Sequence, residues 1–291
     1  MARPLIIALL LGLLPASACS PRERIVVGAK NFTESDLLAE IVAQQIERRT
    51  GIPVERRLHL GGTFVCHEAI AAGHIDAYVE YTGTALTAVL KRRPGGGRGQ
   101  VYRQVADEYA RAYGLVWGRP LGFNNTFAVT VRRADAERHA LRRISDLARV
   151  APQWKAGFGY EFLERADGYA GLASVYGLKF ASAPLEMDLG LTYRALADGK
   201  VDVIAGNSTD GQIVALDLAV LEDDRGYFPP YEAAPVVRAA TLEHHPALRA
   251  ALDELGGTIS DSEMQRLNLL VDIEHRDLAE VARDWLELNL P

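Results

Sequence analysis

Short apolar runs alternate with longer stretches of helical spacing along the chain, which predicts repeated strand–loop–helix units. Residues 25–28 form an apolar run of β type, and residues 36–49 follow with helical periodicity. A second strand is predicted around Val54, a second helix over 66–72, and a turn into a short buried strand over 73–79. Each polar loop falls just past a strand, which is where open α/β sheets place their ligands.

The same pattern returns in the second half of the chain. A predicted helix over 189–197 leads through a glycine turn into a buried strand over 201–205 and then into a polar loop at 207–210. In the first half, a helix, a glycine turn and an Asp-containing strand likewise precede a polar loop at 81–84. A further helix is predicted over 162–176. The repeat predicts an α/β protein of two pseudo-equivalent lobes that face each other across a cleft.

The order of the elements also predicts the lobe boundaries. Residues 121–131 run from a polar turn into a strand, which suits a connection between lobes. We expect residues 19–124 to form most of lobe 1, residues 125–230 to form lobe 2, and residues 231–291 to return to lobe 1. This last part is predicted to contain helices over 246–255, 260–271 and 278–288.

Composition and charge narrow the function classes. The 291 residues can build two domains, and 48% hydrophobic with 24% charged residues is typical of a soluble globular protein. The formal net charge is -6, and the basic residues are scattered without a stripe of interleaved aromatics, which argues against nucleic-acid binding. We find no Cys/His spacing of metal-binding type, and we expect neither a metal nor a cofactor.

The N-terminus has the features of an export signal. Arg3 precedes an apolar core over 5–14, which is too short to span a bilayer, so residues 1–18 are predicted to be a signal peptide. Ala16-Ser17-Ala18 fits cleavage for plain secretion, whereas small residues before Cys19 also resemble a lipoprotein box, although Ala16 stands where such boxes usually carry Leu. We favour lipidation of Cys19. Both routes end outside the cytoplasmic membrane, in the periplasm or at the cell surface.

Catalytic signatures are weak. If Cys19 is lipidated, Cys66 has no disulfide partner, and its apolar helical setting is typical of a buried core residue. The chain has no Gly-x-Ser-x-Gly elbow, zinc-ligand helix or nucleotide loop. Residues 206–208 resemble a nucleophile turn only loosely, with no histidine nearby in the sequence. We expect a non-enzyme, and a secreted hydrolase is the distant alternative.

Several short motifs, in their order and spacing, resemble the substrate-binding proteins of the quaternary-amine ABC importers, the glycine betaine, choline and carnitine osmoprotectant family. The resemblance implies a two-lobed type II periplasmic-binding-protein fold that closes on a trimethylammonium compound and delivers it to the transmembrane subunits of an ABC permease. It also leads us to expect a monomer. The motifs are residues 28–34, 80–84, 124–127, 165–168, 208–211 and 228–231.

The resemblance also implies roles for single residues. A quaternary ammonium has no N–H to donate, so ring faces are its best partners, and a carboxylate needs charge-assisted donors. The matching residues are Lys30 and Arg165 for the carboxylate, Thr84 as a hydroxyl donor, Tyr81 and Tyr231 for the cage, and Asn125 beside it. From the sequence alone, Arg165 has alternative partners in nearby Glu161, Glu164 and Asp167. Tyr160 and Tyr193 are further candidates for the cleft, although helix packing is the better prediction for Tyr193.

Two residues depart from the family pattern. Phe127 stands where betaine binders usually have Tyr, so the ring is kept and the hydroxyl lost. Asn207 stands where they often have another Tyr, so one wall of the cage is missing. We include both in the predicted site. Their chemistry predicts weaker binding of glycine betaine, or a bulkier or more polar betaine-like ligand such as ergothioneine or carnitine.

Overall fold

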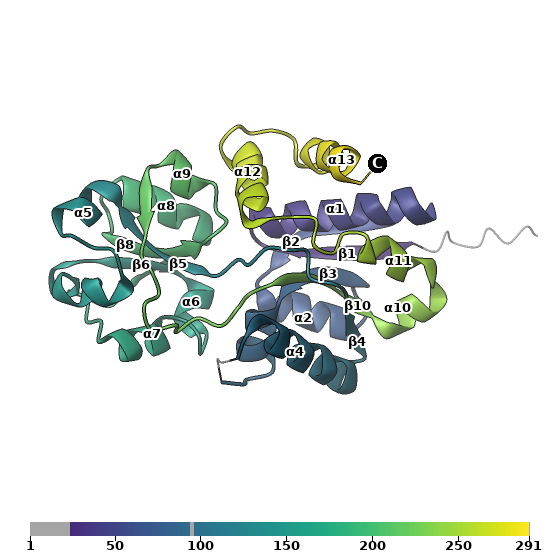
Figure 1. Cartoon of the computed structure of the whole chain (residues 1–291), viewed down its shortest axis with the longest axis horizontal. Helices are drawn as coiled ribbons and strands as arrows, with labels where there is room; N and C mark the ends of the chain where they lie inside the picture. The colour runs from purple at the N-terminus through teal and green to yellow at the C-terminus, as the bar shows by residue number, and fades with distance from the viewer. Residues whose placement is uncertain (1–23, 94–95, 291) are drawn as a thin grey trace, which may run out of the picture.

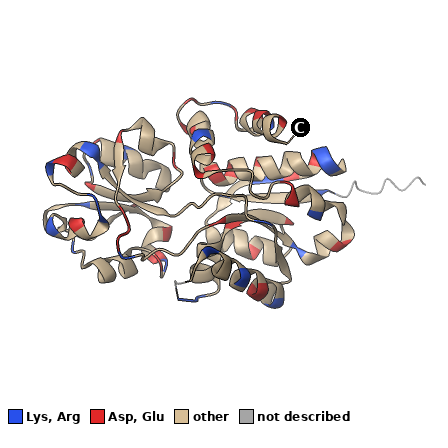
Figure 2. Cartoon of the chain, in the orientation of Figure 1, with Lys and Arg blue, Asp and Glu red and all other residues tan. Residues whose placement is uncertain are grey.

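A computed structural model describes residues 24–93 and 96–290. The chain forms two α/β halves, each built on a five-stranded sheet, and they lie side by side in Figure 1. We call them lobe 1, which holds the first strand, and lobe 2. Charged residues of both signs are interspersed over the two lobes (Figure 2). The predicted signal peptide and Cys19 lie outside the described residues.

The sheet of lobe 1 has the strand order β2-β1-β3-β10-β4. Helix α1 and the C-terminal helices cover one face and α2 and α4 the other, with a buried apolar core on each side. The strands are β1 (Ile25–Lys30), β2 (Val54–Gly61), β3 (Ala77–Tyr81), β4 (Leu115–Trp117) and β10 (Ala233–Arg238). The helices are α1 (Thr33–Thr50), α2 (Thr63–Ala71), α3 (Thr82–Thr84), α4 (Arg98–Tyr113), α10 (Ala239–His244), α11 (Ala247–Asp253), α12 (Asp261–Asp272) and α13 (Leu278–Asn289).

The sheet of lobe 2 has the strand order β7-β6-β8-β5-β9 and is also buried on both faces. Its strands are β5 (Phe127–Arg132), β6 (Ala156–Gly159), β7 (Leu185–Met187), β8 (Val203–Asn207) and β9 (Leu218–Val220). Its helices are α5 (Arg133–Arg138), α6 (Tyr160–Glu164), α7 (Tyr169–Tyr176), α8 (Leu189–Ala197) and α9 (Gln212–Ala215), with 3-10 turns over Ile144–Arg149 and Ala151–Gln153.

The two sheets have the same plan. In each, the second strand in the order pairs in parallel with both of its neighbours, and the next two pairings are antiparallel: β1 with β2 and β3, then β3 with β10 and β10 with β4. Strands β6, β7, β8, β5 and β9 repeat this order and these directions. This confirms the predicted two-lobed α/β fold.

Two segments connect the lobes, one between β4 and β5 and one between β9 and β10 (Figure 1). They are hydrogen-bonded to each other where they cross: the Asn125 N–H donates to the Tyr231 carbonyl oxygen at 3.0 Å, and the Tyr231 N–H donates to Asn124 Oδ1 at 2.6 Å. The crossing is therefore a paired ribbon, and it carries Asn125 and Tyr231 to the junction of the lobes.

Helix α12 makes a third link between the lobes. Its residue Gln265 donates through Nε2 to the Ser208 carbonyl oxygen at 2.8 Å, and Asn268 donates through Nδ2 to the Thr209 carbonyl oxygen at 2.9 Å. The C-terminal residues, expected to belong to lobe 1, thus also contact lobe 2.

Two local predictions were wrong. The single helix predicted over 162–176 is divided into α6 and α7, because Arg165 has an extended backbone and Gly168 lies so close to Phe162 that a Cβ would be 2.0 Å from the Phe162 carbonyl oxygen. The segment after β3, predicted as a polar loop, is helical: α3 continues into a π-helical turn over Ala85–Val89. The Thr87 hydroxyl donates to the Gly83 carbonyl oxygen at 2.8 Å within this turn.

Candidate functional site

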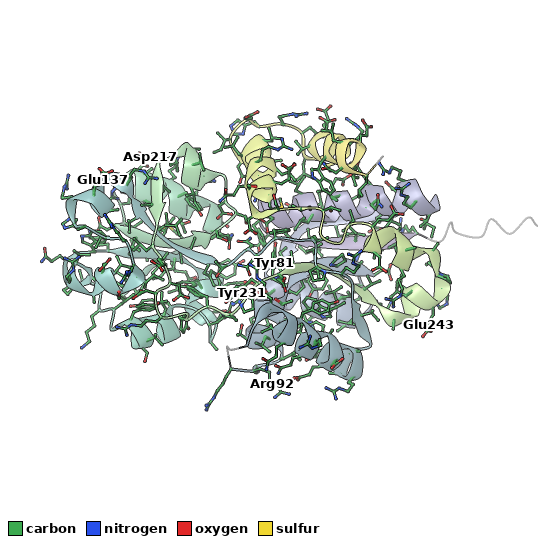
Figure 3. All side chains as sticks on the ribbon, in the orientation of Figure 1. Tyr81, Arg92, Glu137, Asp217, Tyr231 and Glu243 are labelled. Carbon is green, nitrogen blue, oxygen red and sulfur yellow. The ribbon has the colours of Figure 1, made fainter. Side chains whose placement is uncertain are left out.

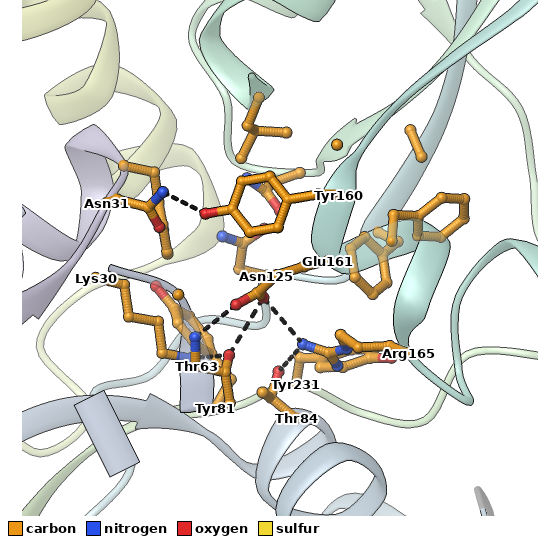
Figure 4. Close-up of a pocket in the computed structure, with 18 residues that line it drawn as sticks. Lys30, Asn31, Thr63, Tyr81, Thr84, Asn125, Tyr160, Glu161, Arg165 and Tyr231 are labelled. Carbon is orange, nitrogen blue, oxygen red and sulfur yellow. Dashed lines mark hydrogen bonds and ion pairs between the residues drawn. The ribbon is translucent and has the colours of Figure 1, made fainter. Parts of the chain in front are cut away.

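A pocket lies where the two lobes meet, at the ends of β1 and β3 in lobe 1 and of β6 and β8 in lobe 2 (Figure 4). Tyr81 and Tyr231 are seen at this junction in Figure 3. The structure brings all the sequence-predicted site residues to its wall: Lys30, Tyr81, Thr84, Asn125, Phe127, Arg165, Asn207 and Tyr231. Their contact with a ligand stays a prediction.

Lys30 ends β1 and is 3% exposed. Because β1 pairs with β3, the Lys30 ammonium is placed beside Glu80, with Nζ 2.5 Å from Oε1. Nζ also donates to the Thr63 hydroxyl at 3.1 Å and lies 5.2 Å from the centroid of the Tyr81 ring. An ammonium has three donors, so one remains for a ligand after these two bonds.

Arg165 lies on the extended segment between α6 and α7 and binds Asp167 in a fork, with Nε–Oδ1 at 2.9 Å and Nη2–Oδ2 at 2.6 Å. Burial alone would raise the pKa of Asp167, but the bonds from Arg165 outweigh it and hold that pKa below its ordinary value. The remaining nitrogen, Nη1, donates to the Thr84 hydroxyl of lobe 1 at 3.2 Å. Asp167 is thus the main partner among the candidates that the sequence offered.

Three of the aromatic rings in the wall are those that the sequence predicted: Tyr81, Phe127 and Tyr231. The Tyr81 hydroxyl donates to Glu34 Oε1 and the Tyr231 hydroxyl to Asp167 Oδ2, both at 2.6 Å, so both hydroxyls point into buried carboxylates. The Phe127 and Tyr231 rings meet edge to face at a centroid distance of 5.8 Å. Gly83 makes the position of Tyr231 possible, because a Cβ there would be 2.6 Å from the ring. The ring faces are therefore held rigidly at the pocket.

Glu34, in the first turn of α1, joins the pocket to the lobe connections. It is 1% exposed and accepts hydrogen bonds from the Tyr81 hydroxyl, Asn125 Nδ2 at 2.8 Å, the Thr209 hydroxyl, and Asn268 Nδ2 at 3.0 Å. Burial raises the pKa of Glu34 in spite of these four bonds. One carboxylate thus ties α1, the crossing ribbon, lobe 2 and α12 together.

Asn207 ends β8, directly opposite Phe127 in the antiparallel pair of β5 and β8. Its backbone N–H donates to Asp210 at 2.9 Å, and Asp210 also accepts from the Tyr193 hydroxyl at 2.6 Å. Tyr193 is 2% exposed and packs in the core, as expected. Tyr160 instead lines the pocket, and its hydroxyl accepts from Asn31 Nδ2 at 2.6 Å.

Burial raises the pKa of Asp210 from 3.8 to about 7. Because the folded state binds this proton more tightly, the carboxyl's contribution to stability is full below about pH 4 and is lost as the pH rises through 7. We expect the melting temperature of wild type, relative to Asp210→Asn, to fall between pH 5 and pH 8 in differential scanning calorimetry. Parallel pH profiles for the two proteins would contradict the assignment.

Sequence reasoning missed part of the wall. The additional lining residues with the clearest contacts are Asn31, Phe32, Thr63, Glu161 and Phe162. The signal for Thr63 was present in the turn at Gly61-Gly62-Thr63. Helix α2 begins at Thr63, whereas the sequence predicted a start at residue 66, and the first N–H groups of the helix therefore face the cleft. From the sequence, Glu161 is a candidate only as a partner of Arg165 on the same helix.

Cys66 is fully buried, and burial raises the pKa of its thiol to about 12, so it is a core residue and a poor nucleophile. Within residues 24–93 and 96–290, no group of His, Cys, Asp and Glu side chains is arranged to hold a metal ion. Across the same residues, every helix is too short or too polar to cross a bilayer. Fold and pocket together define a two-lobed solute-binding protein.

The family model for the substrate-binding domain of the ABC-type glycine betaine transport system matches residues 23–288. The chain is 35% identical over 97% of its length to the ergothioneine transport permease/ergothioneine binding protein EgtU of Helicobacter pylori, and it spans 50% of that longer protein. It is 34% identical to the carnitine transport binding protein OpuCC of Listeria monocytogenes, with 95% of this chain and 90% of the relative covered.

Among solved structures, a glycine betaine/carnitine/choline ABC transporter protein matches with a TM-score of 0.75 at 34% identity, covering 91% of this chain and 98% of the other. The chain belongs to the family of substrate-binding domains of ABC-type glycine betaine transport systems. It is a substrate-binding protein of an ABC transporter and not an enzyme, which confirms the predicted class.

Proposed function

We propose that this protein captures a quaternary ammonium compound bearing a carboxylate in the pocket between its lobes and delivers it to an ABC permease. The observation that carries the proposal is the rigid arrangement of Tyr81, Phe127 and Tyr231 beside Lys30 and Arg165. Each ring face contributes about 0.5–2 kcal/mol to binding a cation, so several rings are needed for useful affinity.

The charges of the pocket suit a zwitterion. Lys30 and Arg165 each have a buried acidic partner, Glu80 and Asp167, so the two pairs together are close to neutral, and Glu161 adds one negative charge to the wall. A ligand with one positive and one negative group adds no net charge to this setting. Its carboxylate would be bound by the remaining donors of Lys30 and Arg165 and by the Thr84 hydroxyl.

Phe127 and Asn207 favour a ligand other than glycine betaine itself. The two residues face each other across β5 and β8. The Asn207 amide is smaller than a tyrosine ring, so it leaves more room for a ligand, and it can form a hydrogen bond with it. Two of the relatives bind, by name, ergothioneine and carnitine, and two others bind, by name, glycine betaine. A larger betaine of this kind is the second candidate within the same transport role.

The remaining expectations complete the proposal. Residues 1–18 direct export, and Cys19 carries a lipid that anchors the mature protein in the membrane, in the periplasm or at the cell surface. The mature protein acts as a monomer. Residues 19–124 with 231–291, and residues 125–230, form the lobes that close on the ligand by bending at the crossing ribbon.

The test is titration calorimetry of the mature protein after unfolding and refolding to strip carried-over ligand. The panel is glycine betaine, choline, carnitine, proline betaine and ergothioneine. We expect at least one of these to bind, with Tyr81→Ala and Arg165→Ala variants losing that binding. Tight binding of glycine betaine would contradict the inference, drawn from Asn207, that the pocket prefers a larger betaine. No heat with any of the five would refute the proposed ligand class.

A further inference from the structure

Glu161, which is not one of the predicted ligand-binding residues, makes a contact across the cleft. It lies on α6 in lobe 2, and its Oε1 accepts a hydrogen bond from the backbone N–H of Thr63 in lobe 1 at 2.5 Å. The Thr63 hydroxyl donates to Oε2 at 3.3 Å (Figure 4). Glu161 and Thr63 are 98 residues apart in sequence, so this contact exists only when the two lobes meet.

The receiving position in lobe 1 is well suited to an anion. Thr63 is the first residue of α2, where N–H groups lack partners inside the helix and the helix dipole favours negative charge. Gly62, just before it, leaves the space that the carboxylate fills, because a Cβ there would be 2.0 Å from Glu161 Oε1. Gly62 has φ -72° and ψ -173°, a conformation open to other residues, so the close approach is what requires glycine.

Two residues near Glu161 in the sequence also form hydrogen bonds between the lobes. Tyr160 is joined to Asn31 across the cleft at 2.6 Å, and Arg165 to Thr84 at 3.2 Å. Arg165 Nη1 lies 3.8 Å from Glu161 Oε2, so the guanidinium that lines the pocket also faces this carboxylate. The Glu161 side chain is 28% exposed, and its removal leaves the cores of both lobes untouched.

We propose that Glu161 is a positioning residue that fastens α6 of lobe 2 to the N-terminus of α2 in lobe 1, and that this contact sets the lifetime of the closed, ligand-bound protein. The proposal rests on the proposed function for its ligand. Glu161 acts through the lobe contact, so its effect is the same for every ligand that the pocket accepts, whether or not that ligand carries a carboxylate.

The test compares Glu161→Ala with wild type in stopped-flow binding of choline and glycine betaine, which share a trimethylammonium group and differ in the carboxylate. Loss of a side-chain acceptor at a helix N-terminus predicts a dissociation rate constant about tenfold higher, by the same factor for each compound that binds, with an unchanged association rate constant. Gly62→Ala keeps Glu161 but blocks its approach to the Thr63 N–H, so its dissociation rate constant should rise as in Glu161→Ala. Glu161→Gln, which keeps an acceptor for the Thr63 N–H, should restore part of the lifetime.

Glu164→Ala, an exposed residue on the same helix, is the matched control and should equal wild type. A Glu161→Ala variant that binds glycine betaine more tightly and choline more weakly would mean that Glu161 competes with the ligand carboxylate, which would overturn the proposal. Unchanged dissociation would overturn it too. If neither compound binds wild type, the radius of gyration from small-angle X-ray scattering decides: it should be larger for Glu161→Ala and Gly62→Ala than for wild type, and equal radii refute the contact's role.

Discussion

Replacing Arg165 by alanine is expected to abolish measurable ligand binding and to destabilise the folded protein. The guanidinium is almost fully buried, holds Asp167 in a fork and reaches Thr84 in the opposite lobe. Without it, the fully buried Asp167 keeps only neutral donors such as the Tyr231 hydroxyl. Removing one partner of a buried ion pair costs about 3–5 kcal/mol, and we expect a loss of this size in the free energy of unfolding by urea.

Arg165→Lys separates charge from geometry. Lysine keeps the positive charge but lacks the planar fork, so stability should fall less than in the alanine variant while ligand affinity still falls strongly. Calorimetric titration with the best compound of the panel and urea unfolding are the two measurements. If the alanine variant binds with wild-type affinity, Arg165 does not contribute to ligand binding, whatever the stability of the variant.

Replacing Tyr231 by alanine is expected to weaken binding of a quaternary ammonium ligand by about 30-fold. The ring is 2% exposed and is held at the pocket between Gly83 and Phe127. A ring face contributes up to about 2 kcal/mol to a desolvated cation, and loss of the ring also frees Phe127 to move. Titration calorimetry measures the change.

Tyr231→Phe is the control for the ring itself. It keeps the aromatic face and removes only the hydroxyl bond to Asp167, so the affinity should stay within a few fold of wild type while the free energy of unfolding falls by about 1 kcal/mol. Equal losses of affinity in the alanine and phenylalanine variants would show that the hydroxyl, and not the ring, is what the ligand requires.

The sequence predicted the repeated lobes because buried parallel strands, glycine turns and polar loops occur in the same order twice. It did not predict β10, the strand inserted between β3 and β4, because Pro235 within it is typical of a connection rather than of a strand inside a sheet. The division of α6 from α7 was also missed, because the extended backbone of Arg165 and the close approach of Gly168 to the Phe162 carbonyl leave the helical spacing of the apolar residues unchanged.

Within the pocket, most of the residues that the motifs predicted lie on strand ends and on the crossing ribbon, such as Lys30, Asn125 and Tyr231. Their positions follow from the order of the elements. Glu161 and Thr63 could not be paired from the sequence, since their contact depends on how the lobes meet. Local pattern thus locates a site within each lobe, and only the fold shows what joins one lobe to the other.

The place of β10 in the sheet also has a consequence for the order in which the protein folds. All strands of lobe 2 lie within one continuous stretch, from Phe127 to Val220, whereas β4 of lobe 1 has β10 as its only neighbour in the described sheet. As the chain emerges from N- to C-terminus, lobe 2 has all its strands before lobe 1 has its last. Until β10 arrives, β3 has an open edge and β4 has no strand to pair with, so the later segment completes the earlier lobe.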